Sequence, residues 1–388
     1  MKIAVFHNLP SGGAKRSLYE FVRRLSVSNT IDLYGYSSQS ERYLDIRSFC
    51  RDVHYYWDRS IESTGYNIFS KIYLFFRLFL FSKRIATDID SNEYDVVFIH
   101  HDIYVQSPLL MAFLKSRSVY YCQEPFRRVY EKQKLNDAES PRSFFADLLL
   151  RVTTDQFLKL IDRVAFNSAD VVLANSHYSS TKIYEAYKIR PDVVYLGVDT
   201  NQFYYMPEVE KENIVLSVGR LHQSKGHDFA ILSVSLVRED IRPILRVLCD
   251  SGNSNYENYL LDLAKNNNVS IIIETVPESE VCKVYNQSLL VISAQRYETL
   301  GLVALESMAC SVPVVGVSEG GVQETIINNK TGFLVERNEE LFANKIEQLL
   351  LDSELRKNFG SNGLKHIKSK WTWDVSTTKI NEKFKEGL

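Results

Sequence analysis

Short apolar runs alternate along the chain with longer amphipathic stretches. The short runs are rich in β-branched and aromatic residues, as buried strands are, whereas the longer stretches repeat their apolar residues at helical spacing. Strands that alternate with helices in this way form parallel sheets. The predicted strands cover residues 2–7, 31–36, 53–57, 95–100, 118–122 and 171–175, then 213–218, 244–249, 269–273, 289–293 and 313–317.

The alternation is interrupted near residues 197–209, where glycine, proline and several polar residues break the pattern. With 388 residues and a usual domain size of about 100–200 residues, the chain has room for two domains. We therefore predict an α/β protein with two doubly wound domains, residues 1–196 and 197–372. Ligands of such sheets bind beyond the carboxyl ends of the strands, so we expect a site in a cleft between the two domains.

The composition is that of an ordinary globular protein, with 45% hydrophobic and 24% charged residues and a formal net charge of -2. It lacks the basic excess of general nucleic-acid-binding proteins, so we expect no nucleic-acid partner. The five cysteines are far apart in sequence and suggest neither a zinc cage nor a disulfide framework. We find no signal-peptide pattern and no run of about 18 apolar residues, and we expect a cytoplasmic protein.

The segment at residues 293–309 turns from a predicted buried strand through Gly301 into an apolar helix. The free N–H groups at a helix N-terminus coincide with the positive end of the helix dipole, which favours a phosphate there. Glu298 and Glu306 stand eight positions apart around this turn, and each can accept hydrogen bonds from sugar hydroxyl groups. The residues alone leave open a capping role for Glu298 and a solvent-facing position for Glu306.

A second predicted strand leads through Gly219, Arg220, Lys225 and Gly226 into an apolar helix. Arginine offers a planar fork of donors and lysine a point charge, and both suit a diphosphate. A solvated loop with two surface charges is the alternative. Because both loops end strand–helix units of one domain, we expect them to converge on one anion.

These segments resemble the retaining glycosyltransferases of the family 4 type, which have the GT-B fold. Glu298 to Glu306 matches the E-x7-E pattern of that family, and Gly219 to Gly226 matches its diphosphate-binding loop. The resemblance covers the second half of the chain almost continuously and the first half in patches. Its further motifs are Asn175-Ser176, Gly197-Val198-Asp199, Val312-Pro313-Val314-Val315, Gly320-Gly321, Glu324 and Gly332.

The resemblance implies that the C-terminal domain binds a nucleotide diphosphate sugar and that the N-terminal domain receives the acceptor. The last helix, within residues 373–388, would cross back to the N-terminal domain. The catalytic residues would be Glu298 at the donor sugar and Arg220 with Lys225 at the pyrophosphate, in place of a divalent metal. Other donor-binding residues implied by the family are Glu306 at the ribose, Thr299, Gly301, Leu302, Val303 and, in the first domain, Gly12 and Gly13.

The loop that carries Gly12 and Gly13 follows the first strand and lacks the full spacing of a dinucleotide fingerprint. A plain strand-to-helix turn therefore remains the alternative to a ligand-binding role. Asp88-Ile89-Asp90 is formally a DxD metal motif, but it follows a predicted helix rather than a buried strand, so we interpret it as a helix end.

The acceptor side departs from the family. Many relatives carry a histidine near the reacting centre, where this chain has Gln123, and glutamine cannot act as a general base. A front-face retaining reaction can use the departing phosphate oxygen as the base instead. The acceptor-side residues that we single out are His101, Gln123 and Glu124. His100, His101 and Asp102 predict no metal site, because adjacent histidines on a strand point apart, and we expect neither a metal nor another cofactor.

The segment at residues 68–84 contains four cations, no acids and a broad aromatic face. At helical spacing, Ser70, Arg77 and Arg84 line one narrow side. Such a helix suits the interface of a membrane, on its cytoplasmic side, and it equally suits a core helix with one wet stripe. Both interpretations remain open at this point.

Taken with the resemblance, the residues predict a hexosyltransferase that moves a sugar from a nucleotide diphosphate sugar to an acceptor hydroxyl with retention. By family analogy the acceptor is a glycan or a lipid-linked saccharide, in polysaccharide or cell-surface glycan biosynthesis. A sugar-nucleotide epimerase of the same fold and a catalytically silent sugar-nucleotide-binding module are the alternatives. An epimerase would need acid and base groups around the sugar, whereas a silent module would bind the donor without turnover.

Overall fold

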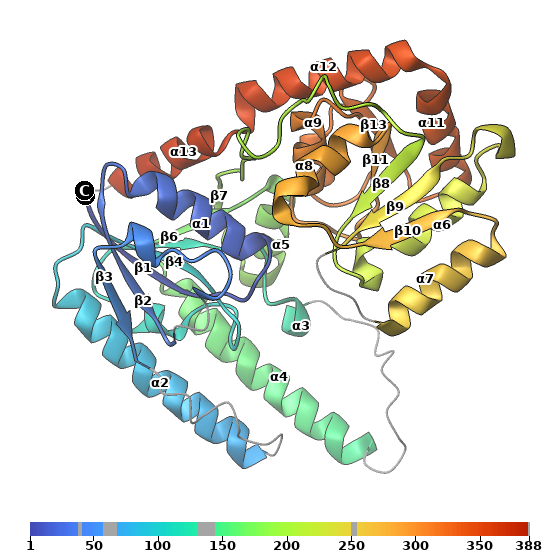
Figure 1. The fold of residues 1–388 in the computed structure, drawn as a ribbon. Helices are drawn as coiled ribbons and strands as arrows, with labels where there is room; N and C mark the ends of the chain where they lie inside the picture. Colours follow the sequence, from blue (N-terminus) through green and yellow to red (C-terminus); the bar gives the residue numbers. More distant parts are fainter. Residues whose placement is uncertain (38–40, 57–67, 131–143, 250–253, 387–388) are drawn as a thin grey trace. The chain divides into compact units, whose positions relative to one another are not determined.

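A computed structural model describes residues 1–37, 41–56, 68–130, 144–249 and 254–386 of the chain. The chain divides into two compact units, residues 1–194 with 377–388 and residues 195–376. Each unit is a parallel sheet with helices packed against it (Figure 1). The predicted fold class, two Rossmann-like α/β domains, is therefore confirmed. The predicted boundary after residue 196 lies close to this division.

The sheet of the first unit has the strand order β3-β2-β1-β4-β5-β6-β7, and each neighbouring pair is parallel. The central strands are buried along almost their whole length, which is why they appear in the sequence as continuous apolar runs. The strands are β1 (Lys2–Asn8), β2 (Thr30–Gly35), β3 (Asp52–Tyr55), β4 (Val96–Asp102), β5 (Ser118–Tyr121), β6 (Val171–Ala174) and β7 (Asp192–Val193).

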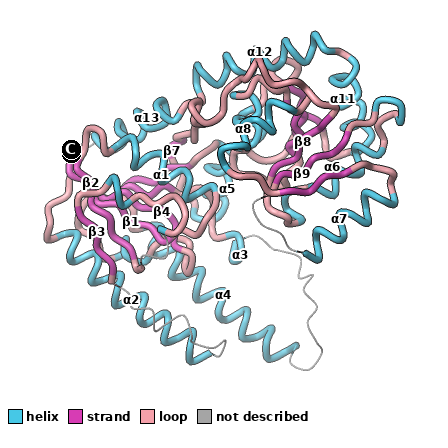
Figure 2. Tube along the Cα trace, in the orientation of Figure 1, coloured by secondary structure: helices cyan, strands magenta, loops and turns pink. Residues whose placement is uncertain are grey.

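Helices cover both faces of this first sheet (Figure 2). On one face Phe166 packs against Tyr120, and on the other Phe21 packs against Tyr121, since neighbouring residues of a strand point to opposite sides. The helices are α1 (Gly13–Leu25), α2 (Ile68–Asp90), α3 (Arg127–Tyr130), α4 (Phe144–Asn167) and α5 (His177–Tyr187), with a 3-10 turn at Leu109–Ala112. None of the helices in the described part of the chain is both long and apolar enough to cross a lipid bilayer.

The sheet of the second unit has the strand order β10-β9-β8-β11-β12-β13 and is also parallel throughout. Its strands are β8 (Ile214–Val218), β9 (Ile244–Leu248), β10 (Ile271–Glu274), β11 (Leu290–Ser293), β12 (Val314–Val317) and β13 (Gly332–Val335). Its helices are α6 (His227–Ser235), α7 (Ser254–Asn266), α8 (Glu278–Gln287), α9 (Leu302–Ala309), α10 (Val322–Thr325), α11 (Glu339–Leu351) and α12 (Ser353–Lys370).

Each sheet has a point at which the strand order reverses. In the first unit β1 lies between β2 and β4, and in the second unit β8 lies between β9 and β11. The connections leave in opposite directions there, so a crevice opens at the carboxyl ends of the two neighbouring strands, and open α/β sheets bind ligands in that crevice. The predicted loops follow β1, β8 and β11, and His101 lies near the end of β4, so the fold positions them where a ligand site is expected, whereas Gln123 and Glu124 follow the next strand, β5.

Two strands were not predicted. The edge strand β7 has two residues, too few to form a recognisable pattern. The other, β13, begins at Gly332 just after Asn329, which has a positive φ of 59°, so its sequence resembles a turn. Trp57, at the end of the predicted third strand, lies outside the described residues.

The last helix, α13 (Trp373–Lys385), begins in the second unit and ends in the first. In the first unit Lys383 forms an ion pair of 2.8 Å with Asp192, and the ring of Phe384 packs on that of Phe98. The sequence predicted this return of the chain. The helix-end interpretation of the DxD segment is also confirmed, because Asp90 is the last residue of α2 and its carboxylate accepts the N–H groups of Lys115 and Ser116.

Candidate functional site

Two loops of the second unit meet at the carboxyl ends of β8 and β11. Gly226, in the left-handed region with φ 71°, lies so close to the end of β11 that an added Cβ would be 2.2 Å from the carbonyl oxygen of Ala294. The N–H of Arg296 donates to the carbonyl of Ser224 at 2.8 Å, which joins the two loops directly. Only a glycine permits this approach, and the approach sets Lys225 beside the segment that carries Glu298.

The ammonium of Lys225 and the carboxylate of Glu298 form an ion pair of 2.9 Å across the two loops. About a quarter of each side chain is exposed, 25% for Lys225 and 27% for Glu298. The structure thus brings together one predicted pyrophosphate-binding residue and the predicted sugar-binding residue. Because the pair is open to solvent, a phosphate or a hydroxyl group can compete for either partner.

The loop that carries Glu298 is fixed from the other side by two glycines. Gly320 has φ 64°, and an added Cβ would lie 2.4 Å from the carbonyl oxygen of Glu298. The N–H of Gly321 donates to that same carbonyl at 2.8 Å. A further brace comes from Arg337, whose guanidinium pairs with Glu319 at 2.8 Å and donates to the carbonyl of Ala294 at 3.1 Å. The backbone around the carboxylate is therefore held before any ligand arrives.

Helix α9 begins immediately after this loop. Gly301 is its N-cap residue with φ 95°, and the N–H groups of Leu302 and Val303 lie in the first turn, where an α-helix has no partners for them. Farther along the helix, the carboxylate of Glu306 accepts a hydrogen bond of 2.7 Å from the hydroxyl of Tyr285, a buried residue of α8. The predicted phosphate-binding amides and both glutamates thus belong to one continuous turn and helix.

The Arg220 side chain is exposed at the end of β8, and its backbone is held by His227. The buried ring of His227 contacts the hydroxyl of Ser217 at 2.9 Å and the carbonyls of Gly219 and Arg220 at 3.3 Å each. Burial lowers the pKa of His227, so the ring is neutral near pH 7. The loop is therefore anchored, while the Arg220 guanidinium faces solvent.

In the first unit, Gly12 and Gly13 begin helix α1 after β1. Gly12 has φ 137°, a conformation that side chains rarely adopt, and an added Cβ would meet nothing within 4 Å. The exposed loop therefore requires glycine for its backbone angle and leaves open space above it. Below the loop lies a buried cluster of His7, Lys15 and Glu41 that the sequence did not suggest.

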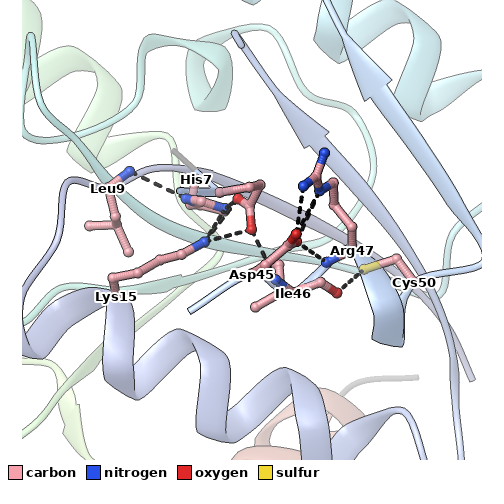
Figure 3. Close-up of polar contacts among 8 residues, drawn as sticks. His7, Leu9, Lys15, Asp45, Ile46, Arg47 and Cys50 are labelled. Atoms are coloured by element: carbon pink, nitrogen blue, oxygen red, sulfur yellow. Dashed lines mark hydrogen bonds and ion pairs between the residues drawn. The ribbon is translucent and has the colours of Figure 1, made fainter. Parts of the chain in front are cut away.

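Figure 3 shows His7 and Lys15 pointing toward each other from β1 and α1. The ammonium of Lys15 donates to both carboxylate oxygens of Glu41 at 2.8 and 2.9 Å, and Nε2 of His7 lies 2.7 Å from the same carboxylate. The backbone N–H of Ile46 also donates to Glu41 at 2.9 Å. The side chains of Lys15 and Glu41 are completely buried. The buried carboxylate thus joins Lys15 of α1 to His7 of β1, the two elements on either side of the glycine loop.

The protonation of this cluster follows from its contacts. Burial lowers the pKa of His7, so the ring is neutral near pH 7. Its Nδ1 accepts a hydrogen bond of 3.3 Å from the N–H of Leu9, and the ring proton therefore lies on Nε2, toward Glu41. Burial alone raises the pKa of Glu41, but the hydrogen bond from His7, the charge of Lys15 and the N–H of Ile46 outweigh it and lower the pKa to about 2. The carboxylate is therefore ionised at neutral pH.

The three predicted acceptor-side residues lie together at the ends of β4 and β5. Nε2 of His101 accepts the backbone N–H of Gln123 at 2.9 Å, and the Gln123 side chain donates to the hydroxyl of Ser17 at 2.7 Å. Burial lowers the pKa of His101 to about 4. Glu124 pairs with Arg127 at 2.9 Å in a partly exposed position. His101 and Gln123 are thus bound into the fold, and Glu124 is the most accessible of the three.

The two adjacent histidines of β4 point apart, as expected. His100 packs against Phe98 and Tyr121, whereas His101 packs against Tyr120. Among the described residues, no group of three or more histidine, cysteine or carboxylate side chains is arranged to hold a metal ion.

Sequence reasoning missed Lys15, Glu41, Tyr285 and Arg337. Lys15 lies in the first turn of α1, and its partner Glu41 lies 26 residues away in a loop. Tyr285 and Arg337 contact the predicted site from α8 and from the segment after β13. A buried charge carries no local sequence signal, although a lysine two positions after a glycine pair is a place to look for one.

Two family models match the chain. The model described as Glycosyltransferase Family 4 matches residues 11–202, and the one described as Glycosyl transferases group 1 matches residues 201–366. The two matches adjoin one another near the division between the units, and together they account for most of both units.

Curated relatives extend the likeness over the whole chain. It is similar to the alpha-1,3/1,6-mannosyltransferase ALG2 of Dictyostelium discoideum, with 23% identity over 427 aligned positions that cover 98% of this chain and 97% of that protein. It is also similar to the capsular polysaccharide biosynthesis glycosyltransferase CapM of Staphylococcus aureus, with 30% identity over 185 positions that cover 45% of this chain and 48% of CapM.

Among solved structures, HepE of Anabaena in complex with UDP matches this chain with a TM-score of 0.73 at 16% identity, and each chain is covered over 100% of its length. At this level of identity the likeness concerns the fold, and it supports the two-unit architecture described above.

Proposed function

The two family models identify the chain as a glycosyltransferase of the family 4 type with the GT-B fold, and on this premise we propose that it is a retaining hexosyltransferase. In this proposal it transfers a sugar from a nucleotide diphosphate sugar to a hydroxyl of a glycan or lipid-linked saccharide. The relatives support this class of reaction, since ALG2 is described as a mannosyltransferase and CapM as a glycosyltransferase of capsular polysaccharide biosynthesis. Polysaccharide or cell-surface glycan biosynthesis and a cytoplasmic location belong to the proposal.

The observation that carries the proposal is the meeting of Lys225, Glu298 and the first turn of α9 at the switch point of the second sheet. A cation and unused helix amides suit a diphosphate, and a carboxylate beside them suits the hydroxyl groups of a sugar. One small site thus offers partners for both halves of a nucleotide diphosphate sugar.

The Lys225–Glu298 ion pair suggests how the donor enters. An arriving phosphate replaces the carboxylate as the partner of Lys225, and the released Glu298 then accepts hydrogen bonds from the donor sugar. As the sugar–phosphate bond breaks, negative charge grows on the leaving diphosphate. Lys225, Arg220 and the amides of α9 therefore stabilise the transition state more than the ground state. In this mechanism the cations act without a divalent metal, and the phosphate oxygen that departs takes the acceptor proton.

The remaining roles follow the resemblance. Glu306, oriented by Tyr285, would bind the nucleotide ribose, and Thr299 and Gly301 would add contacts to the donor. In the first unit Gly12 and Gly13 would contribute to donor binding, and the acceptor-side residues His101, Gln123 and Glu124 would face the acceptor. Gln123 cannot remove a proton, and the low pKa of His101 with its Nε2 already occupied makes it a poor base near pH 7, which favours a reaction in which the phosphate acts as the base.

A product assay tests the proposal. A panel of nucleotide diphosphate sugars is screened for thermal stabilisation, because a ligand that binds the native state raises the melting temperature. The stabilising donor is then incubated with and without an acceptor panel, and nucleoside diphosphate release is measured. We expect release that depends on acceptor, and a product whose anomeric configuration matches the donor. An epimerised donor without release would instead indicate an epimerase, and binding without any turnover a silent module.

Arg220→Ala sharpens the same assay, with Lys265→Met on the exposed surface of α7 as a control that removes a cation elsewhere. We expect turnover at saturating sugar donor to fall by about 100-fold in Arg220→Ala, because one group that stabilises the transition-state charge is lost. Turnover should stay unchanged in Lys265→Met. An Arg220→Ala protein that keeps most of its turnover contradicts the electrophilic role of the loop.

A further inference from the structure

The outer face of α2 exposes large apolar side chains. Tyr73, Phe76 and Leu80 are 47%, 57% and 45% exposed, and at helical spacing they form a single stripe. The stripe continues toward the end of the helix through the exposed cations Lys83 and Arg84. The sequence analysis had placed Ser70, Arg77 and Arg84 on one narrow side of this helix. The exposed stripe includes Arg84, whereas Arg77 is only partly exposed, and the Ser70 side chain lies outside the described part.

Helix α4 carries a second stripe of the same kind. Phe157, Leu160 and Val164 are 50%, 62% and 50% exposed and recur at intervals of three and four residues, and the exposed Arg163 adjoins them. The opposite side of this part of α4 packs into the core through Ile161, Ala165 and Phe166. The sequence analysis did not single out this stripe.

The two stripes belong to one surface. The ring of Phe75 on α2 contacts the half-exposed ring of Phe157 on α4, with a centroid separation of 5.1 Å. Figure 1 shows the two helices side by side on the same face of the first sheet. The exposed apolar side chains of the two helices thus gather on one face, and large exposed apolar clusters mark interaction sites. We call this cluster the α2–α4 patch; it consists of Tyr73, Phe76, Leu80, Phe157, Leu160 and Val164.

Cations accompany the patch, and carboxylates are turned away from it. Arg77 lies over the ring of Phe81 at 4.9 Å, and Arg84 lies over the ring of Tyr56 at 5.5 Å, so both stems lie along the aromatic surface. Of the acids on these two helices within residues 73–90 and 155–167, Asp162 is buried, Asp88 accepts a hydrogen bond from the hydroxyl of Tyr56, and Asp90 accepts one from the backbone N–H of Ser116. Asp155 is half-buried. The exposed stripes themselves carry Lys83, Arg84 and Arg163.

We propose that the α2–α4 patch docks on a lipid bilayer that contains anionic lipid. Aromatic and leucine side chains flanked by exposed lysine and arginine are the composition of interfacial segments, in which the apolar groups enter the acyl boundary and the cations meet the head groups. A protein partner of matching shape would equally bury the apolar residues. On the described parts of the two helices, however, the exposed charged side chains beside the patch are the cations Lys83, Arg84 and Arg163, which complement a surface of uniform negative charge. The inference does not depend on the proposed sugar transfer.

Vesicle flotation of the full-length protein tests the docking. Vesicles of phosphatidylglycerol with phosphatidylcholine are compared with phosphatidylcholine alone, at low salt and at about 0.5 M salt, where exposed charges are screened beyond a few ångströms. We expect binding to the anionic vesicles at low salt, weakened by salt and by removal of the anionic lipid. No binding to the anionic vesicles at low salt overturns the proposal, and so does equal binding to both kinds of vesicle.

Two pairs of substitutions separate the apolar and the charged contributions. Phe76→Glu with Leu160→Glu should weaken partitioning by about tenfold or more for each residue, because each removes a buried apolar side chain from the lipid-bound state. Lys83→Ser with Arg84→Ser should weaken it by about 30-fold in total, from about fivefold for each cation near an anionic surface. Variants that bind as tightly as the unaltered protein overturn the assignment of this face.

The matched control is Leu261→Glu with Leu351→Glu, exposed leucines of the second unit at 42% and 59% exposure. These should bind vesicles unchanged, and circular dichroism should show that all variants remain folded. Sedimentation velocity provides the remaining arm: a dimer that is lost in Phe76→Glu with Leu160→Glu, together with no vesicle binding, assigns the patch to a second copy of the chain and overturns the lipid proposal.

Discussion

Each unit contains a lysine–glutamate ion pair beside a glycine loop that follows the first strand of its sheet, and the two pairs differ in their surroundings. Lys15 and Glu41 lie 2.8 Å apart with both side chains at 0% exposure, and Lys225 and Glu298 lie 2.9 Å apart with about a quarter of each exposed. The separation is almost the same. What differs is access to water, and therefore to a ligand.

The difference indicates what each pair does. A completely buried pair must be satisfied within the protein, and Glu41 receives hydrogen bonds from Lys15, His7 and the backbone of Ile46. A half-open pair contributes little to stability, because solvent screens it, but its partners can exchange for a phosphate or a hydroxyl. We therefore expect the buried pair to support its glycine loop and the open pair to take part in binding.

Removal of Lys15 is expected to give the largest effect. Lys15→Met leaves the Glu41 carboxylate buried beside a neutral histidine, and the free energy of unfolding should fall by about 3–5 kcal/mol. Lys225→Met should cost less than about 1 kcal/mol, since that pair is partly solvated. Denaturant titrations measure both. Equal losses of stability in the two variants would mean that burial does not distinguish the two ion pairs.

The double variant Lys15→Met with Glu41→Leu provides the control for the first prediction. If the cost arises from an uncompensated charge, replacing both partners by apolar residues should recover part of the loss. A double variant that is less stable than Lys15→Met alone would indicate that packing, rather than charge, dominates at this position.

Acid should reveal the buried pair next. The pKa of Glu41 in the folded protein is about 2, below the ordinary value of 4.5, so its stabilisation is complete above about pH 4.5 and is lost as the pH falls toward 2. The cost of Glu41→Gln should therefore be smaller at pH 3 than at pH 7 by about 2 kcal/mol. Urea titrations of both proteins at the two pH values measure it. A cost of Glu41→Gln that does not change between pH 7 and pH 3 would mean that the pKa of Glu41 is not lowered in the folded protein.

The open pair should instead govern turnover. Lys225→Met should lower turnover at saturating donor by about 100-fold while the melting temperature changes by no more than a few degrees. Initial-rate measurements with the donor identified by screening test this. Lys265→Met serves as the control for loss of a surface cation. If Lys225→Met lowers the melting temperature strongly and leaves turnover unchanged, the Lys225–Glu298 pair is structural, like the buried pair of Lys15 and Glu41.

The two glycine loops offer the smallest contrast. Gly226→Ala brings a Cβ to 2.2 Å from the carbonyl of Ala294, so it should cost about 3 kcal/mol and displace Lys225. Gly12→Ala meets no atom within 4 Å and should cost only the strain of its backbone angle, about 1–2 kcal/mol. The difference in denaturation midpoint reports the contrast. An equal cost at both positions would mean that the contact with Ala294 relaxes easily.

The sequence predicted the parts of the fold that are repeated locally. Buried parallel strands appear as apolar runs. The turn through Gly301 and the Gly219–Gly226 loop were recognisable because glycines, cations and the start of an apolar helix follow one another in the order that a phosphate site requires. What it could not predict were contacts across the fold. The ion pair of Lys225 with Glu298, the hydrogen bond of Tyr285 to Glu306, and the clamp of Arg337 on Ala294 depend on strand order, which no local pattern records.

Burial was the second property that the sequence concealed. Nothing in the sequence indicated that Lys15 is buried, yet its side chain is completely buried in an ion pair with Glu41. For residues 68–84 the sequence left an interfacial and a core helix open, and it did not single out Leu160; Phe76 and Leu160 are more than half exposed, at 57% and 62%. Whether a charge or an aromatic ring is exposed depends on the neighbouring elements, and the prediction improves only once those neighbours are known.

Calorimetric titration of the screened donor into three proteins tests the central claim, that the second unit binds a nucleotide diphosphate sugar through the turn and helix that carry Glu298 and Glu306. The unaltered protein and Glu280→Gln, an exposed carboxylate of α8, should bind with equal affinity. Glu306→Gln should bind at least about tenfold more weakly, because a charge-assisted hydrogen bond contributes about 1.5–3 kcal/mol. Failure of every nucleotide diphosphate sugar to bind, or equal binding by all three proteins, would contradict the account.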